Sequence, residues 1–246
     1  MYRILKEVGQ NQRRDRSRRL NKPSKPDSVK ATGPGQCFTW DITFLPSQVR
    51  GLYFKLYMIV DLFSRKVVGW EVHDRECGEY AAQLLYKTQL KEGIQPHALT
   101  LHSDNGSPMK SETMLAMMER LGVIGSFSRP SVSNDNPFSE SLFKTLKYVP
   151  MYPNKPFETL DEARKWTLSF VTWYNAEHRH SGIRYVTPNE KHAGKDKKIL
   201  KKRSKTYQQA QARTPLRWAR STRNWSPVTE VTLNPESVIE EEKKAA

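Results

Sequence analysis

Apolar residues begin to recur at regular spacing near residue 37. Residues 10–36 have no apolar periodicity and are rich in Arg, Lys, Pro and Ser, which predicts an extended, mobile arm. Residues 1–9 are typical of the last turns of a helix, too short to fold alone. The pattern therefore predicts that the folded body begins at Cys37.

Three β-strands are predicted in residues 37–73. CFTWDITF alternates between apolar and polar residues, which places Asp41 on the polar side of a strand. GLYFKLYMIVDLF is almost continuously apolar, as a strand buried on both faces should be. KVVGWEVHD follows a turn at Ser64 and Arg65, so the three strands form an antiparallel meander.

The rest of the body alternates between helices and short strands, and the whole pattern predicts a mixed α/β layer fold. In the tail, part of 196–213 is expected to be helical and VTEVTL to be a short strand. The body's further elements are predicted as helices at 79–92, 111–121, 137–148 and 159–178, with strands at 98–102 and 123–127.

Charge separates the chain into three parts. Residues 1–36 carry 10 Lys and Arg against 3 acidic residues, residues 191–246 carry 14 against 6, and residues 37–190 are neutral. A neutral body with two basic flanks favours a polyanion-binding protein; the alternative is solvated tails that maintain solubility. No signal peptide or membrane-length apolar run is present, and Cys37 and Cys77 are expected to be free thiols in a cytoplasmic setting.

Three carboxylates stand at positions typical of catalytic groups. Asp41 lies within a strand, Asp104 directly follows one, and Glu140 lies one turn into a helix. The start of that helix is predicted from Asn136 as the N-cap and Pro137 at the first helical position.

The helix that carries Glu140 is amphipathic. Glu140, Lys144 and Lys147 form one narrow stripe, and the opposite face carries Phe138, Leu142, Leu146 and Val149. The stripe offers a carboxylate and two cations to a ligand, or it is an ordinary exposed Glu–Lys pair.

A set of three carboxylates suits hard divalent cations, which prefer oxygen ligands. Two such ions about 3.5–4 Å apart assist an in-line phosphoryl displacement by activating the nucleophile and stabilising the leaving oxygen. No Gly-rich phosphate loop, nucleophile elbow or HExxH helix supports a rival chemistry. Asp61 competes for a place in the site, although it is better interpreted as a cap of the following turn. His102 is expected to be a packed neutral ring, and His178 belongs to a basic HRH run.

The chain resembles the bacterial insertion-sequence transposases of the retroviral-integrase superfamily, in particular the copy-out–paste-in group translated from two overlapping reading frames. In that group 35 residues separate the second Asp from the Glu, as they separate Asp104 from Glu140, and a basic residue seven positions later corresponds to Lys147. The resemblance is carried by TWDITFLP, LYMIVDLFSRKVVGWEV, LHSDNGS, SVSNDNPFSESLFKTLKY and WYNAEHRHSGIRYVTPNE, and the closing NWSPVTEVTLNP is also similar.

The resemblance implies an RNase H-like catalytic core at 37–190, with a basic arm at 1–36 and a basic tail at 191–246. It implies that Asp41, Asp104 and Glu140 bind two Mg²⁺ or Mn²⁺ ions, which support 3′-end cleavage of DNA and strand transfer. Lys144 and Lys147 would contact the DNA end, and the protein would act as a homo-oligomer on DNA, in the cytoplasm at the bacterial nucleoid. The other residues expected to bind DNA are Arg13, Arg14, Arg16, Arg18, Arg19, Lys201, Lys202 and Arg203.

Full-length relatives carry helix-turn-helix segments before the catalytic core, and the sequence here opens at MYRIL, normally their trailing edge. A partner from the upstream reading frame is one expected source of that segment. Two alternatives remain at this point: a non-catalytic DNA-binding or regulatory derivative of a transposase, and a stand-alone nuclease such as a ribonuclease H.

Overall fold

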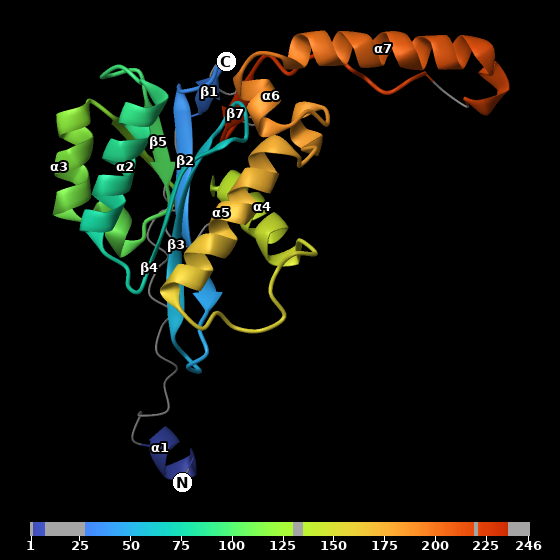
Figure 1. The fold of residues 1–246 in the computed structure, drawn as a ribbon. Helices are drawn as coiled ribbons and strands as arrows, with labels where there is room; N and C mark the ends of the chain where they lie inside the picture. Colours follow the sequence, from blue (N-terminus) through green and yellow to red (C-terminus); the bar gives the residue numbers. More distant parts are fainter. Residues whose placement is uncertain (1, 8–27, 130–134, 219–220, 236–246) are drawn as a thin grey trace.

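The computed structural model describes residues 2–7, 28–129, 135–218 and 221–235. A mixed α/β body forms most of it, and one long helix projects from the body (Figure 1). The elements in chain order are α1 (Tyr2–Glu7), β1 (Val29–Ala31), β2 (Cys37–Pro46), β3 (Tyr53–Asp61), β4 (Val67–His73), α2 (Gly78–Glu92), β5 (Thr100–Ser103), η1 (Ser107–Lys110), α3 (Glu112–Leu121), β6 (Ile124–Phe127), α4 (Pro137–Tyr148), α5 (Leu160–Ala176), η3 (Ser181–Ile183), α6 (Pro188–His192), α7 (Asp196–Arg213), η4 (Pro215–Arg217) and β7 (Val231–Leu233).

The main sheet has five strands in the order β4-β3-β2-β5-β6. Strands β2, β3 and β4 form the predicted antiparallel meander, whereas β5 and β6 are parallel to β2. The chain reaches the parallel strands through α2 and α3, because a parallel connection needs a crossover. The predicted mixed α/β class is confirmed.

Helices cover both faces of this sheet (Figure 1). On one face α2 and α3 pack over a cluster that includes Trp40 and Leu85. On the other face α4 and α5 pack over a cluster that includes Leu146 and Phe170. The side chain of Trp40 belongs to the α2–α3 face, so the next residue, Asp41, points to the face that α4 covers.

Parts of both predicted flanks join the body. β1, from the basic arm, pairs antiparallel with β7, from the tail, and the pair packs through Ala31 and Leu233, both fully buried. Lys191 and Asp196 form a buried ion pair of 2.7 Å next to this contact. The predicted strand in VTEVTL and the predicted helix at 196–213 are both confirmed. In the described part of the chain, no helix has the length and apolar character of a membrane span.

Candidate active site

Strand register brings Asp41 and Asp104 to the same level of the sheet. In the parallel pair, Thr39 lies opposite His102, and each aspartate follows two residues later in its own strand direction. Asp41 therefore lies on β2 at the level where the neighbouring strand β5 ends, and Asp104 is the first residue after β5. The spacing of parallel strands places the two carboxylates side by side at this edge.

Helix α4 brings Glu140 to the same edge. It begins at Pro137, as predicted, and Leu142 and Leu146 are buried against the sheet while Glu140 is exposed in the first turn. Asn136 occupies the N-cap position but its side chain makes no capping bond. Its Nδ2 donates to the carbonyl of Trp40 at 3.4 Å, which ties the start of α4 to the residue before Asp41.

The three carboxylates act on one another electrostatically. Burial, together with the negative charges of Asp104 and Glu140, raises the pKa of Asp41 to about 7, against a lowering effect of the Ile42 amide and of Lys147. Ionising a half-buried carboxyl next to two negative charges is unfavourable. A cation bound beside the carboxyl would favour its ionised form.

The donor set fits a hard divalent ion. Asp41 Oδ1 accepts from the Ile42 amide at 2.7 Å, and Asp104 Oδ1 accepts from the Gly106 amide at 2.9 Å. The second oxygen of each has no hydrogen-bond partner among the described residues. Within the described part of the chain, no group of three or more His, Cys, Asp or Glu side chains is placed so that it could hold a metal ion as it stands. Carboxylate oxygens of this kind are the ligands that hard divalent ions prefer.

Two lysines complete the exposed stripe of α4. Lys144 and Lys147 are both exposed, as predicted, while the opposite face of the helix is buried. Lys147 lowers the pKa of Asp41 through its charge, so its ammonium lies near the carboxylate site.

Asp61, the competing carboxylate, is structural. It is fully buried, and it accepts hydrogen bonds from the Ser64 amide and hydroxyl, both at 2.6 Å, and from the Gly35 amide at 2.7 Å. These bonds cap the turn between β3 and β4, as the sequence indicated. His102 is also buried, with Nδ1 2.9 Å from Ser126 Oγ and Nε2 2.9 Å from the Asp135 carbonyl oxygen.

One supporting pair was not predicted. Asp135 accepts from the backbone amide and the guanidinium of Arg129, with Nη2 to Oδ1 at 3.0 Å. The hydrogen bonds and charge of Arg129 hold the pKa of Asp135 below its usual range. The pair joins the end of β6 to the start of α4 and so helps to place Glu140. Neither residue has a spacing signal in the sequence that marks it for this contact.

The predicted DNA-binding positions are distributed unevenly. Lys201 and Lys202 are exposed on α7. Arg203 Nη1 donates to the carbonyls of Arg184 and Tyr185 at 3.0 and 2.8 Å, so that part of its guanidinium fastens α7 to the body. The arm arginines lie outside the described residues: Arg13, Arg14, Arg16, Arg18 and Arg19.

Comparison with known proteins identifies the family of this chain. The integrase core domain family matches residues 31–133, and a second integrase core domain family matches residues 121–188. The fold is similar to a chain of the simian T-cell lymphotropic virus intasome solved by cryo-electron microscopy in complex with PP2A regulatory subunit B56 gamma. That similarity has a TM-score of 0.54 at 20% identity, over 69% of this chain and 58% of the other. The fold is therefore that of the RNase H-like integrase catalytic cores.

Relatives found by sequence similarity show which group of integrase-core proteins the chain belongs to. The chain is 32% identical to the transposase of insertion sequence element IS904 from Lactococcus lactis subsp. lactis, over 70% of this chain and 67% of the relative. It is 30% identical to transposase InsF of IS3A from Escherichia coli K12, over 65% of this chain. It spans 54% of the length of InsF. The chain belongs to the insertion-sequence transposases that carry an integrase core domain.

Proposed function

We propose that this chain cleaves the 3′ ends of a mobile DNA element and joins them to another strand, with Asp41, Asp104 and Glu140 as the catalytic carboxylates. The observation that carries the proposal is the convergence of the three acids. Strand register sets Asp104 level with Asp41, and the Asn136–Trp40 hydrogen bond holds the start of α4, with Glu140, beside them. The membership of the transposase family supports the same chemistry.

The integrase core family depends on a divalent metal. In the proposed site Asp41, Asp104 and Glu140 would hold two Mg²⁺ or Mn²⁺ ions. When bound, such ions activate the attacking oxygen and stabilise the leaving oxygen of a phosphodiester. The acids act in their ionised form, as ligands that fix the reacting groups.

The lysines of α4 position the DNA end in this proposal. Lys144 and Lys147 stand one turn apart on the exposed stripe that carries Glu140, so both ammonium groups face a strand entering the site. Cations there hold the scissile phosphate in line with the nucleophile, which lowers the entropic part of the barrier. Two element ends must be held together, so we propose a homo-oligomer on DNA at the nucleoid, with terminal sequences read by an upstream-frame helix-turn-helix partner.

The test is a cleavage and joining assay on a labelled duplex that carries the element end, with Mg²⁺. Asp41→Asn, Asp104→Asn and Glu140→Gln should each lower both reactions by at least about a hundredfold, while binding of the duplex stays within a few fold. Glu119→Gln is the matched control, because Glu119 is an exposed acid on α3, and it should remain fully active.

Other outcomes would contradict the proposal in distinguishable ways. An inactive wild-type chain that still binds DNA would favour the non-catalytic derivative. Hydrolysis of an RNA–DNA hybrid in preference to the DNA end would favour a ribonuclease. Near-normal activity of one of the three variants would remove that residue from the site.

A further inference from the structure

Helix α7 and the segment that returns beside it enclose a groove outside the catalytic face. Its volume is about 980 Å³, and every residue that lines it comes from 197–227. None comes from β2, from α4 or from the end of β5, where the three acids lie. α7 extends from the body beyond α6 (Figure 1), so the groove and the carboxylate site are separate places on the molecule.

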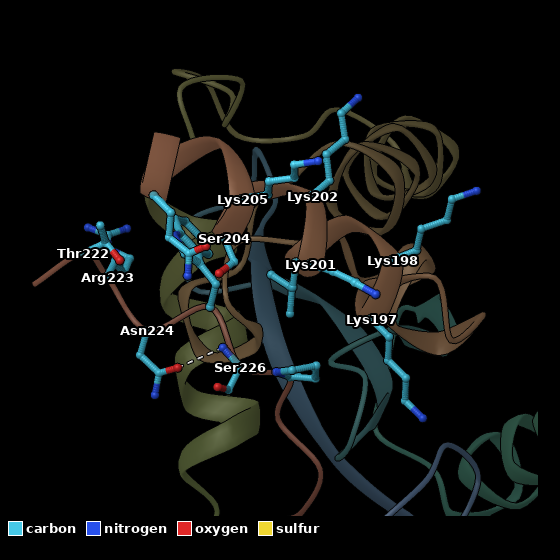
Figure 2. A pocket seen from close by; sticks show the side chains of 14 residues that line it. Lys197, Lys198, Lys201, Lys202, Ser204, Lys205, Thr222, Arg223, Asn224 and Ser226 are labelled. Atoms are coloured by element: carbon cyan, nitrogen blue, oxygen red, sulfur yellow. Dashed lines mark hydrogen bonds between the residues drawn. The ribbon is translucent and has the colours of Figure 1, made fainter. Parts of the chain in front are cut away.

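The groove is strongly basic. Arg223 and five lysines of α7 line it, and among the described residues no Asp or Glu does so. The lysines are exposed, and none forms an ion pair with a described residue. Figure 2 shows their side chains extending from the helix in several directions, with Thr222, Arg223 and Asn224 of the returning segment to the left of them. The five are Lys197, Lys198, Lys201, Lys202 and Lys205.

The spacing of these lysines suits a nucleic-acid backbone. Lys197, Lys201 and Lys205 stand on successive turns, and a rise of about 1.5 Å per residue separates the first from the last by roughly 12 Å. One strand of B-DNA presents a phosphate about every 3.4 Å along its axis. The row therefore spans about four phosphates of one strand, with Lys198 and Lys202 beside it.

The groove is preformed because its walls are fastened to the body. Leu200 is 1% exposed and packs with Ile183 and Val186, and Arg203 is bonded to two carbonyls of the preceding loop. Trp225 packs against Tyr207 with ring centroids 5.0 Å apart, which holds the returning segment on α7. A preformed charged groove loses little conformational entropy when it binds.

The surroundings favour a duplex over a single strand. Proteins that hold single strands without sequence preference combine basic grooves with aromatic side chains on which bases stack. The aromatic residue lining this groove is Trp225, which is 8% exposed and covered by Tyr207. Its ring offers no stacking surface, whereas the lysines offer contacts to phosphates only.

We propose that the α7 groove binds the sugar–phosphate backbone of duplex DNA, away from the bond that reacts in the catalytic site. This inference rests on the proposed function, which supplies DNA as the substrate. The groove holds a flanking stretch of the element or target duplex, so it contributes to affinity and has no part in the phosphoryl transfer. Its contacts are to phosphates and carry no sequence preference.

The test compares two variants of the full chain with equal loss of charge. The groove variant is Lys197→Gln, Lys198→Gln and Lys205→Gln, all three in the lining of the groove. The control is Arg120→Gln, Lys155→Gln and Lys165→Gln, three exposed cations outside the groove. Binding to a duplex of about 40 base pairs is titrated between 50 and 200 mM salt, beside single-stranded DNA and duplex RNA of the same sequence. Cleavage is measured on a short duplex end at saturating concentration.

The groove variant should bind the long duplex at least about tenfold more weakly at low salt. The slope of log affinity against log salt should be shallower by roughly 2 to 3, at about 0.9 per phosphate contact. In the control variant, the affinity and the salt slope should both change much less than in the groove variant. Cleavage of the short end should be unchanged in both variants.

Equal slopes for the groove variant and the control would overturn the inference while leaving wild-type cleavage, and therefore the proposed function, intact. A larger loss on single-stranded DNA or on duplex RNA than on duplex DNA would also overturn it. A wild-type chain without metal-dependent cleavage would instead contradict the proposed function, whatever the salt slopes are. Circular dichroism of both variants checks that α7 is still folded.

Discussion

Glu92 and His192 form an ion pair between α2 and α6, with His192 Nε2 3.0 Å from Glu92 Oε2. On its other side, His192 Nδ1 is 3.0 Å from Ser64 Oγ. Ser64 has one hydroxyl hydrogen and donates it to Asp61 at 2.6 Å, so Nδ1 must be the donor to Ser64.

Acid should weaken the fold through Glu92. Burial raises the pKa of the Glu92 carboxyl, but hydrogen bonds and charges from His192 and Lys66 outweigh it and lower that pKa to about 2. A carboxyl with a lowered folded pKa stabilises the fold above its unfolded value near 4.5, and the contribution is lost as the pH falls towards 2. After solvent screening, the loss should be on the order of 1–2 kcal/mol.

Urea unfolding at pH 5 and pH 3 measures this loss. Glu92→Gln should show a smaller decrease in the free energy of unfolding between these two values than the wild type. Equal decreases would mean that Glu92 does not contribute to the acid sensitivity.

Asp61→Asn should destabilise the protein without disabling the catalytic site. The change removes a buried charge that accepts three hydrogen bonds at the β3–β4 turn, so we expect the free energy of unfolding to fall by about 2–4 kcal/mol. Denaturant titration gives that value. Cleavage per folded molecule should stay near the wild-type level, and a loss as complete as that of Asp41→Asn would place Asp61 in the metal site.

Lys147→Ala should lower strand joining by about tenfold or more and lower overall DNA affinity by less than about threefold. One cation beside the carboxylates positions the substrate, whereas many distant cations supply affinity. The measurement is the joining rate at saturating DNA together with the dissociation constant. Parallel losses in the two would make Lys147 one phosphate contact among many.

The reactions should require Mg²⁺ or Mn²⁺ and should gain nothing from zinc. All the proposed ligands are carboxylates, and no described Cys or His group offers the softer donors that favour zinc. Cleavage is measured after dialysis against chelator and again after each ion is restored. Persistent activity in excess chelator would contradict the metal mechanism.

Gly69→Ala should destabilise the packing of α2 on β4. A Cβ at this position would overlap with Thr88 Oγ1 and would lie 3.3 Å from Leu84 Cδ1. We expect a loss of about 1–3 kcal/mol in the free energy of unfolding from overpacking. Thr88→Ala in the same chain removes the closest atom, so the double variant should be more stable than Gly69→Ala alone. The comparison is made by thermal or denaturant unfolding, and a double variant no more stable than Gly69→Ala would contradict this packing.

Local pattern by itself determined most of the secondary structure and the candidate acids. The apolar run of β3, the alternation in β2 and the start of α4 at Pro137 were all predicted, because burial on one or two faces leaves a period in the sequence. The amphipathic pattern of α4 also predicted which side Glu140 and Lys147 share. The roles of the three acids remain predictions, since sequence spacing and geometry do not measure activity.

Tertiary structure alone decided how distant segments meet. The pairing of β1 with β7, the ion pair of Glu92 with His192 and the bond from Asn136 to Trp40 join residues far apart in the chain. Such contacts depend on which faces lie together after folding, and a single sequence carries no period that encodes them. The groove along α7 has the same origin: the lysines are visible in the sequence, but packing of the returning segment against the helix makes them the wall of one site.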